Sequence, residues 1–294
     1  MSNIVLISDS SCDLPESLLH EYNIQIIPYY VSFDQETYYR EKTELPISEF
    51  YKRLRSEKIF PKTSLPSITD YVECFTPHVA AGKSIICVCI SGHFSGSYNA
   101  ARNACELILE NYPNAQIEII NSLNATAGEG ALVQEIGRMI ADGLSFEQVV
   151  KTAYTLRDHA RIFFFVETLE YLEKGGRIGK ASALLGTMLN VKPIIYLQDG
   201  LLFPAGKVRG SKKAFSKVVE LTKEYVGDCV NDYNYMIAHA DNLEYASIMY
   251  DLVTSELGVT ISEDYTFIGT TVGVYTGPDA VGICLIPKYE KYLA

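Results

Sequence analysis

An apolar run that leads directly into a turn of serine and glycine residues limits the fold of this chain more than any other feature. The run Ser84–Ile90 has the composition of a buried strand, Ser91–Ser97 forms the turn, and the helix-like stretch Tyr98–Ala104 follows. Shorter apolar strands at Ile4–Ile7 and Ile117–Ile120 are also followed by polar turns and helical patterns. Strands that alternate with helices are typical of a parallel sheet covered by helices on both faces. We therefore predict a doubly wound, mostly parallel α/β fold up to about residue 160.

The pattern changes after Arg161, where strands follow one another with fewer helices between them. Asp199-Gly200 is a strong hairpin signal between two of these strands. The strands predict an α+β region with an antiparallel sheet, and they lie at 162–166, 193–197, 201–203, 235–239 and 282–286. We therefore expect an α/β domain over residues 1–160, with a small β-rich insertion of short antiparallel strands near 24–45, followed by an α+β domain over residues 161–294.

The composition describes a packed globular protein of 294 residues, 48% of them hydrophobic, with a formal net charge of −11. An acidic chain is poorly suited to broad binding of nucleic acid or anionic membranes, because both require basic surface. No stretch approaches the ~20 apolar residues of a membrane span, and the N-terminal segment lacks the pattern of a signal peptide. We expect neither nucleic-acid binding nor stable membrane insertion.

Seven cysteines are present, and no two of them form a Cys-x-x-Cys motif. Cys87, Cys89 and Cys284 lie in apolar strand-like runs, where free thiols behave as small hydrophobic side chains. We expect Cys87 and Cys89 to point to opposite faces of their strand. The five histidines show none of the spacings of a zinc enzyme. The chain is therefore predicted to be a reduced, cytoplasmic protein without a disulfide framework or a metal site.

The turn Ser91–Ser97 is the best candidate for an anion site. Free backbone N–H groups at a helix N-terminus attract anions, and serine hydroxyls add donors that carry no charge. The turn lacks the Gly-Lys-Ser/Thr ending and the Gly-x-Gly-x-x-Gly spacing of nucleotide-binding loops. A turn that only caps the helix explains the same residues equally well. Ligands of parallel sheets lie beyond the carboxyl ends of the strands, which is where Asp9, Ser91 and Ser122 fall.

Residues 181–191 form an apolar stretch with almost no polar face. A helix that is apolar all round is normally buried. A core helix is therefore the favoured interpretation, and a helix that lines a lipid cavity is the alternative.

A basic run follows the hairpin signal and consists of Lys207, Arg209, Lys212 and Lys213. Such a run is usually a solvated face. Together with Arg177, it would instead form a docking site for an anionic group or an acidic partner.

Five segments resemble the motifs of the DegV family. They are Ser8–Pro15, Lys62–Ser67, Ser91–Ser97, Tyr171–Lys180 and Ile268–Gly282. Their order and spacing match from the first strand to the last, so the resemblance covers essentially the whole chain. It implies a carrier that holds a long-chain fatty acid, such as palmitate, stearate or oleate, between its two domains. It also implies that no cofactor is needed, and that the carrier presents the fatty acid to a separate fatty-acid kinase that phosphorylates the carboxyl group.

The resemblance implies roles for individual residues. The hydroxyl groups of Thr63 and Ser95 would hold the carboxylate of the ligand, with Ser64, Ser91 and Gly96 adjoining. The acyl chain would lie in an apolar tunnel. The segment Gly175-Gly176-Arg177 matches a Gly-Gly-Arg motif whose arginine is associated with the kinase and the acyl phosphate. Lys207 and Arg209 would extend the same positive patch.

Two positions depart from the family pattern. Tyr275, which precedes Thr276, stands where His is common, and Asn121 stands where Asp is common. A tyrosine donates a hydrogen bond but does not titrate near neutrality. We therefore expect Tyr275 and Thr276 to belong to an altered headgroup site.

Two other classes of protein stay open. An acyl- or phosphoryl-transferase would use Ser95 as its nucleophile, and it would need a base beside the hydroxyl. His93 lies in the same turn, but the Gly-x-Ser-x-Gly pattern of a nucleophile elbow is absent there. A regulatory or scaffolding module is the third class. The predicted function is that of a lipid-binding carrier rather than an enzyme.

Overall fold

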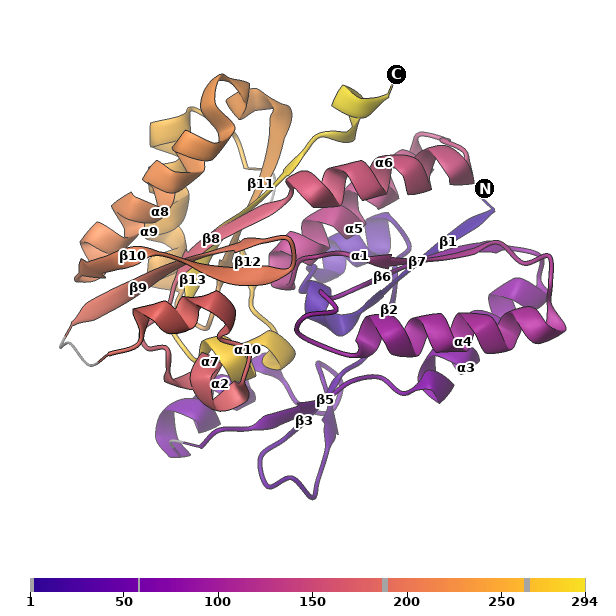
Figure 1. Cartoon of the computed structure of the whole chain (residues 1–294), viewed down its shortest axis with the longest axis horizontal. Helices are drawn as coiled ribbons and strands as arrows, with labels where there is room; N and C mark the ends of the chain where they lie inside the picture. The colour runs from indigo at the N-terminus through magenta and orange to yellow at the C-terminus, as the bar shows by residue number, and fades with distance from the viewer. Residues whose placement is uncertain (1–2, 58, 187–189, 262–264, 294) are drawn as a thin grey trace.

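The computed structural model of the chain describes residues 3–57, 59–186, 190–261 and 265–293. Its two large sheets lie side by side (Figure 1). The first sheet is parallel throughout, with the strand order β2-β1-β6-β7. Its strands are β2 (Gln25–Ile27), β1 (Ile4–Asp9), β6 (Ser84–Cys89) and β7 (Ile117–Asn121).

Helices cover both faces of this parallel sheet. On one face, α3 (Ile68–Ala80) and α4 (Ser97–Asn111) pack against β6 and bury the rings of Tyr71 and Phe75. On the other face lies α5 (Thr126–Ala141), and α1 (Glu16–Glu21) contributes Leu18 to the same core. The predicted doubly wound arrangement is confirmed.

The region 24–45 differs from the prediction in one respect. β2 joins the parallel sheet beside β1, so the first strand of this region is not antiparallel. A small antiparallel sheet of order β4-β3-β5 follows, and α2 (Ile47–Glu57) lies between β4 and β5 in the sequence. Its strands are β3 (Tyr30–Ser32), β4 (Tyr39–Arg40) and β5 (Lys62–Ser64).

The second large sheet has the order β10-β9-β8-β13-β11-β12, and every pair except β11–β12 is antiparallel, as predicted for this half. The strands are β8 (Arg161–Phe165), β9 (Val191–Gln198), β10 (Leu201–Arg209), β11 (Tyr233–His239), β12 (Thr266–Phe267) and β13 (Val281–Pro287). α8 (Ser211–Val226) and α9 (Leu243–Leu257) cover its outer face (Figure 1).

Between the two sheets lie α5 and α6 (Phe146–His159). α5 contacts β1 of the parallel sheet and also β11 and β13 of the antiparallel sheet. One hydrophobic cluster therefore runs through both halves. The remaining helices are short: α7 (Glu170–Gly175), α10 (Thr270–Thr276) and the 3₁₀ turns Ser10–Cys12, Gly179–Leu184, Gly227–Asp232 and Tyr289–Tyr292.

The helix predicted over residues 181–191 is wrong where the structure describes it. A 3₁₀ turn covers Gly179–Leu184, Leu185 is 40% exposed, and Val191 begins β9. Gly186 has φ = +134°, a conformation that interrupts a helix and that L side chains rarely adopt. Residues 187–189 of the predicted helix lie outside the described residues.

The side chains of Cys87 and Cys89 lie on the same face of β6. The sulfur atoms of Cys87 and Cys89 lie 4.0 Å apart, so the expectation of opposite faces is wrong, because residues i and i+2 of a strand share a face.

No helix within the described ranges is both long and apolar enough to cross a membrane.

Candidate functional site

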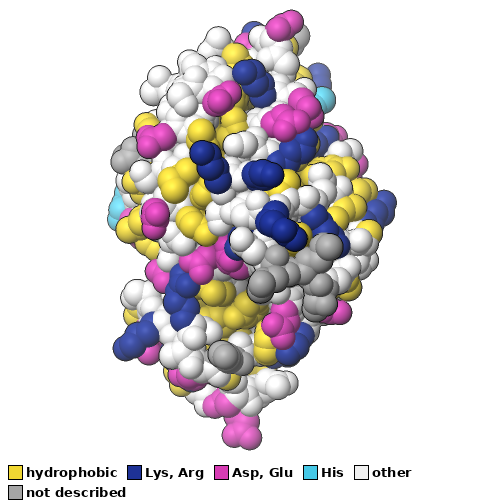
Figure 2. All heavy atoms as spheres, turned by 90° about the vertical axis from the view of Figure 1, so that its left-hand side faces the viewer, with side chains coloured by type: hydrophobic (Ala, Val, Ile, Leu, Met, Phe, Trp, Pro, Cys, Tyr) yellow, Lys and Arg dark blue, Asp and Glu magenta, His cyan; other side chains and the backbone are white. Residues whose placement is uncertain are grey.

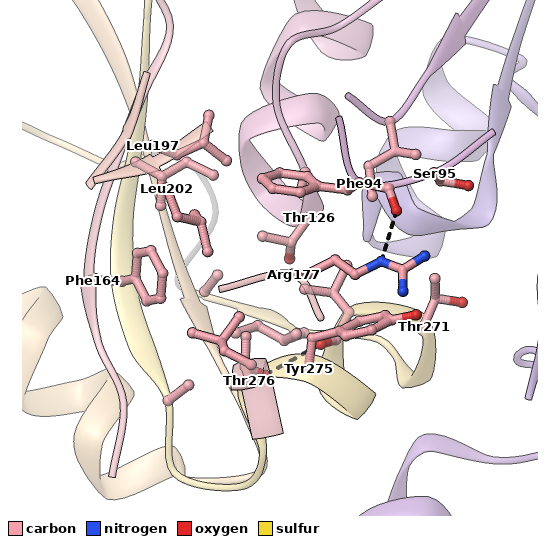
Figure 3. A pocket seen from close by; sticks show the side chains of 18 of the residues that line it. Phe94, Ser95, Thr126, Phe164, Arg177, Leu197, Leu202, Thr271, Tyr275 and Thr276 are labelled. Carbon is pink, nitrogen blue, oxygen red and sulfur yellow. Dashed lines mark hydrogen bonds between the residues drawn. The ribbon is translucent and has the colours of Figure 1, made fainter. Parts of the chain in front are cut away.

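A cavity lies between the two halves of the molecule, and its walls differ in character (Figure 3). The antiparallel sheet supplies an apolar wall, which includes Ile162, Phe164, Leu197, Leu202 and Cys284. The opposite side carries hydroxyl groups from β5, from the turn before α4 and from α10. These belong to Thr63, Ser95, Thr271, Tyr275 and Thr276.

The apolar wall follows from the register of four adjacent strands. Cys284 of β13 pairs with Ile162 of β8, Ile162 pairs with Leu197 of β9, and Leu197 pairs with Leu202 of β10. Paired residues point to the same face of a sheet, so the four side chains form one row. Three strand spacings of about 4.8 Å make this row roughly 14 Å long. Its chemistry suits an extended apolar chain.

Ser95 carries the first polar group of the opposite wall. Its Oγ accepts hydrogen bonds from the Tyr29 hydroxyl at 2.7 Å and from the backbone N–H of Ser97 at 3.2 Å. Burial raises the pKa of Tyr29 well above its ordinary value, so Tyr29 is a permanent donor. Since both lone pairs of Ser95 Oγ are occupied, its own proton remains available to an acceptor in the cavity.

Thr63 and Tyr275 form the second polar group. Their hydroxyl oxygens lie 2.7 Å apart, and either residue can be the donor. The Tyr275 ring packs directly on the backbone of Gly175, where a Cβ atom would lie 2.3 Å from Tyr275 Cδ1. Glycine at this position therefore allows the ring to reach Thr63. Whichever hydroxyl donates within the pair, the other keeps a proton free.

The other hydroxyls of the cavity wall already donate to protein acceptors. Thr126 Oγ1 donates to Asp13 at 2.5 Å, Thr271 Oγ1 donates to Glu41 at 2.7 Å, and Thr276 Oγ1 donates to the Gly277 carbonyl at 3.2 Å. Within the described residues, two free hydroxyl protons therefore remain on the wall. One comes from Ser95 and one from the Thr63–Tyr275 pair. We call these three residues, Ser95, Thr63 and Tyr275, the polar corner of the cavity. Its two donors match in number the two oxygens of a carboxylate.

The turn Ser91–Ser97 contributes to the cavity wall through its side chains more than through its backbone N–H groups. The N–H groups of Gly92, His93, Phe94 and Ser95 donate to acceptors within the protein. The expectation that the turn presents free backbone N–H groups is therefore wrong for these residues. The Asn121 amide oxygen accepts the N–H of Gly92 at 3.2 Å, so Asn121 helps to shape the turn.

The neighbours of Thr63 and Ser95 occupy different places. Gly96 lies on the cavity wall, and its Cα faces Leu65. Ser64 is exposed, and the buried Ser91 donates to the Gly200 carbonyl at 3.0 Å, which ties the turn to the β9–β10 hairpin. Among the described lining residues, neither Ser64 nor Ser91 appears. They flank the polar corner without facing it.

Asp9 and Ser122 are buried and do not belong to the described cavity wall. Asp9 is fully buried and accepts a hydrogen bond from Ser97 Oγ at 2.7 Å, and Ser97 in turn holds Ser95 through its N–H. Ser122 donates to the Asn124 carbonyl. Asp9 thus supports the site from a second layer, and burial raises the pKa of its carboxyl.

Arg177 lies where the cavity meets the surface, since it is exposed and also lines the wall. Its Nε donates to the Phe94 carbonyl at 3.1 Å (Figure 3), and its Nη1 donates to the Gly175 carbonyl at 2.8 Å. The guanidinium lies 5.2 Å from the centre of the Tyr275 ring. Arg177 therefore ties two backbone segments together beside the polar corner.

Lys207 and Arg209 lie on the edge strand β10 and are exposed. Figure 2 shows Lys and Arg side chains gathering on the face that carries the end of β10 and the start of α8. Neither residue belongs to the described cavity wall. They lie on the outer surface, whereas Arg177 lies at the cavity.

Sequence reasoning missed Tyr29 and the carboxylates behind Thr126 and Thr271. Tyr29 is one of many tyrosines in its region, and nothing in the neighbouring sequence indicates that it is the partner of Ser95. Asp13 belongs to the first motif, where its buried position is not visible from sequence. No cluster of residues able to hold a metal ion occurs within the described parts of the chain.

Comparisons with known proteins agree with this architecture. The family model described as "Uncharacterised protein, DegV family" matches residues 3–288. A DegV domain-containing protein of Caldanaerobacter subterraneus is 32% identical over 287 residues, which cover 96% of this chain and 98% of that protein.

Two solved structures are similar over almost their whole length. A stearic acid-binding protein from Eubacterium ventriosum is 38% identical with a TM-score of 0.92, covering 99% of this chain and 100% of that one. A fatty-acid-binding DegV family protein from Thermus thermophilus is 27% identical with a TM-score of 0.89, covering 98% and 100%. This chain belongs to the DegV family.

Proposed function

We propose that this protein binds one long-chain fatty acid between an α/β domain of residues 1–160 and an α+β domain of residues 161–294. The observation that carries the proposal is the pairing of two free hydroxyl protons at one corner with an apolar wall on the opposite side. The fatty-acid-binding relatives from Eubacterium ventriosum and Thermus thermophilus support the same ligand class. Palmitate, stearate and oleate are suitable candidates.

In this proposal Ser95 and the Thr63–Tyr275 pair hold the carboxylate. Gly96 leaves space beside them, and Thr276 contributes to the wall while its hydroxyl stays bound to the backbone. Hydrogen bonds to a charged group contribute about 1.5–3 kcal/mol each. Burial of about a dozen methylene groups contributes roughly 10 kcal/mol before the costs of association. The tail therefore sets affinity, and the hydroxyls set orientation.

We further propose that the bound fatty acid is presented to a fatty-acid kinase in the cytoplasm. Arg177 is exposed beside the carboxylate corner, so it is placed to meet an anionic group or a partner at the cavity mouth. Lys207 and Arg209 supply positive charge on a chain whose net charge is −11. Such charge favours encounter with an acidic partner surface.

The geometry favours Ser95 as a donor over Ser95 as a nucleophile. A nucleophilic serine needs a base that accepts its proton. The partners of Ser95 Oγ within the described structure are donors, namely the Tyr29 hydroxyl and the Ser97 N–H. His93 in the same turn is exposed. A carrier explains this arrangement better than a transferase.

Native mass spectrometry of the protein purified from a heterologous host tests the ligand. We expect an added mass of one long-chain fatty acid per chain, or uptake of added palmitate or oleate. Thr63→Ala with Ser95→Ala should weaken binding without unfolding the protein, and the exposed Ser64→Ala is the matched control. A ligand-free wild type that takes up neither fatty acid would contradict the proposal.

A further inference from the structure

The apolar wall has a second row of residues beside the one that runs from Cys284 to Leu202. In this row, Ala238 of β11 pairs with Gly282 of β13, and Gly282 pairs with Phe164 of β8. All three residues line the cavity. The next residue of the row, Ile195 of β9, pairs with Phe164 but is not on the described cavity wall. The cavity therefore ends at Phe164 along this row.

Phe164 lies far from the polar corner. In Figure 3 it stands on the opposite side of the cavity from Ser95 and Thr271. It is also the one large side chain in a row whose other lining members are an alanine and a glycine. A ligand held by its carboxylate at Ser95 would therefore bring its methyl end toward this ring.

Gly282 allows β8 to approach β13 closely at this point. A Cβ atom on Gly282 would lie 2.5 Å from Phe164 Cβ and 2.8 Å from the Phe163 carbonyl oxygen. Any side chain at position 282 would have to displace Phe164. Gly282 thus provides the space that Phe164 occupies, since any side chain at position 282 would take the same space.

We propose that Phe164, positioned by Gly282, is the stop that sets the longest acyl chain this protein accepts. The inference rests on the proposed fatty-acid function and adds to it the residue that determines chain length. A smaller side chain at 164 lengthens the accepted tail, and a larger one at Ala238, which faces the same space, shortens it.

The test offers an equimolar series of saturated fatty acids of increasing length to the purified protein and identifies the bound species by native mass spectrometry. Phe164→Ala should shift the preferred ligand to chains longer by about two to four methylene groups, since a cavity replaces the ring. Phe164→Leu should give a smaller shift in the same direction. Ala238→Val should shift the preference to shorter chains.

Phe165→Leu is the matched control. Phe165 is the next residue of β8, points to the opposite face and packs edge-on against Phe215 with ring centres 5.2 Å apart. It should lose thermal stability while keeping the wild-type chain preference.

Two results overturn the inference, and they are distinguishable. If the wild type binds fatty acid but the Phe164 and Ala238 variants keep its chain preference, Phe164 is not the stop and the proposed function stands. If the wild type binds no fatty acid, the proposed function fails and the inference fails with it. If Phe164→Ala does not fold, Phe164→Leu and Ala238→Val give the same test with smaller changes in volume.

Discussion

The two sheets meet the cavity in different ways. The antiparallel sheet presents the middle of its strands, so its contribution is a flat array of side chains such as Ile162 and Leu197. The polar wall instead comes from the turn before α4, from β5 and from the short helix α10, where single hydroxyl groups such as that of Ser95 face the cavity. A sheet face suits a ligand tail that needs area, and loops suit a headgroup that needs direction. This difference is what the fatty-acid site that we propose between the two walls requires.

The halves also differ in what they bury. The acidic side chains that the structure describes as buried are Asp9, Asp13, Glu41, Glu129 and Glu135, all from the first half. Glu41 accepts hydrogen bonds from Ser10 and from both the hydroxyl and the N–H of Thr271. Of the five, Asp9, Asp13 and Glu41 support residues of the cavity wall from behind. The antiparallel sheet needs no such support, because the side chains that it contributes to the wall, such as Ile162 and Leu197, are apolar and require no hydrogen-bond partner.

The largest effect that we expect comes from these buried carboxylates. Burial, with a further contribution from the nearby Glu41 carboxylate, raises the pKa of Asp13 to about 8. The native state therefore keeps a proton at pH values where the unfolded chain, with an ordinary pKa of 3.8, has lost it. This contribution to stability is complete below about pH 4 and is lost as the pH rises toward 8.

Asp13→Asn should remove that part of the pH dependence. Urea unfolding at about pH 5 and about pH 8 should show a smaller fall in the free energy of unfolding for Asp13→Asn than for the wild type, and each pKa unit corresponds to about 1.4 kcal/mol. The exposed Asp251→Asn is the control and should behave as the wild type. Equal falls in all three proteins would show that Asp13 is ionised in the native state.

The next largest effect should come from a polar group placed in the tail wall. Leu197→Ser should weaken fatty-acid affinity roughly ten- to a hundred-fold, because a buried hydroxyl without a partner costs about 1–3 kcal/mol. Ile195→Ser is the matched control, since Ile195 is buried on the same face of β9 but is not on the described cavity wall. Titration calorimetry should separate them, with lower affinity in Leu197→Ser and lower stability in both. A similar loss of affinity in Ile195→Ser would contradict the assignment of Leu197, but not Ile195, to the cavity wall.

A smaller effect should follow from Tyr29→Phe. The substitution removes the hydrogen bond to Ser95 at 2.7 Å, so the Ser95 proton is no longer directed into the cavity. We expect affinity to fall by roughly three- to ten-fold, in line with one hydrogen bond of about 1 kcal/mol. The carbon-13 resonance of a labelled ligand carboxylate should move as well. An unchanged resonance would remove Tyr29 from the site.

Arg177→Ala should have the smallest effect on binding. Its described hydrogen bonds go to backbone carbonyls, and in the site that we propose hydroxyl groups hold the carboxylate. We expect affinity within about two-fold of the wild type, while acyl-phosphate formation with a competent kinase falls. A variant with normal phosphorylation and a lower melting temperature would mark Arg177 as purely structural.

The sequence allowed prediction of the features that depend on residues close together in the chain. The strands, the hairpin at Asp199-Gly200 and the alternation of the first half follow from short-range patterns, and the structure has them. The polar corner could not be assembled in the same way. Tyr29 and Ser95 are 66 positions apart, and Thr63 and Tyr275 are 212 positions apart, so nothing in their neighbourhoods indicates the pairing. The family resemblance brought Thr63 and Ser95 together, but it gave no reason to include Tyr29.

Apolar patterns also failed where glycine intervened. The stretch near residue 181 is hydrophobic enough for a core helix, yet Gly179 and Gly186 both have positive φ angles and leave only a short 3₁₀ turn between them. Hydrophobicity predicts burial better than it predicts conformation. Ala181 is fully buried and Leu185 is 40% exposed, so even burial varies along this stretch.

The hydrogen bond between Arg177 and the Phe94 carbonyl connects the cavity wall to an exposed side chain. Phe94 and Ser95 are consecutive, so the peptide that links them is held from outside by a guanidinium while the next side chain faces inward. In the proposed site, a ligand that accepts the Ser95 proton would bind directly beside this peptide, and the exposed Arg177 is hydrogen-bonded to the same peptide. The surface around Arg177 would thus differ between the ligand-free and the ligand-bound protein, even when the ligand itself is buried. A partner that touches Arg177 would have a means of telling the two forms apart before any transfer begins.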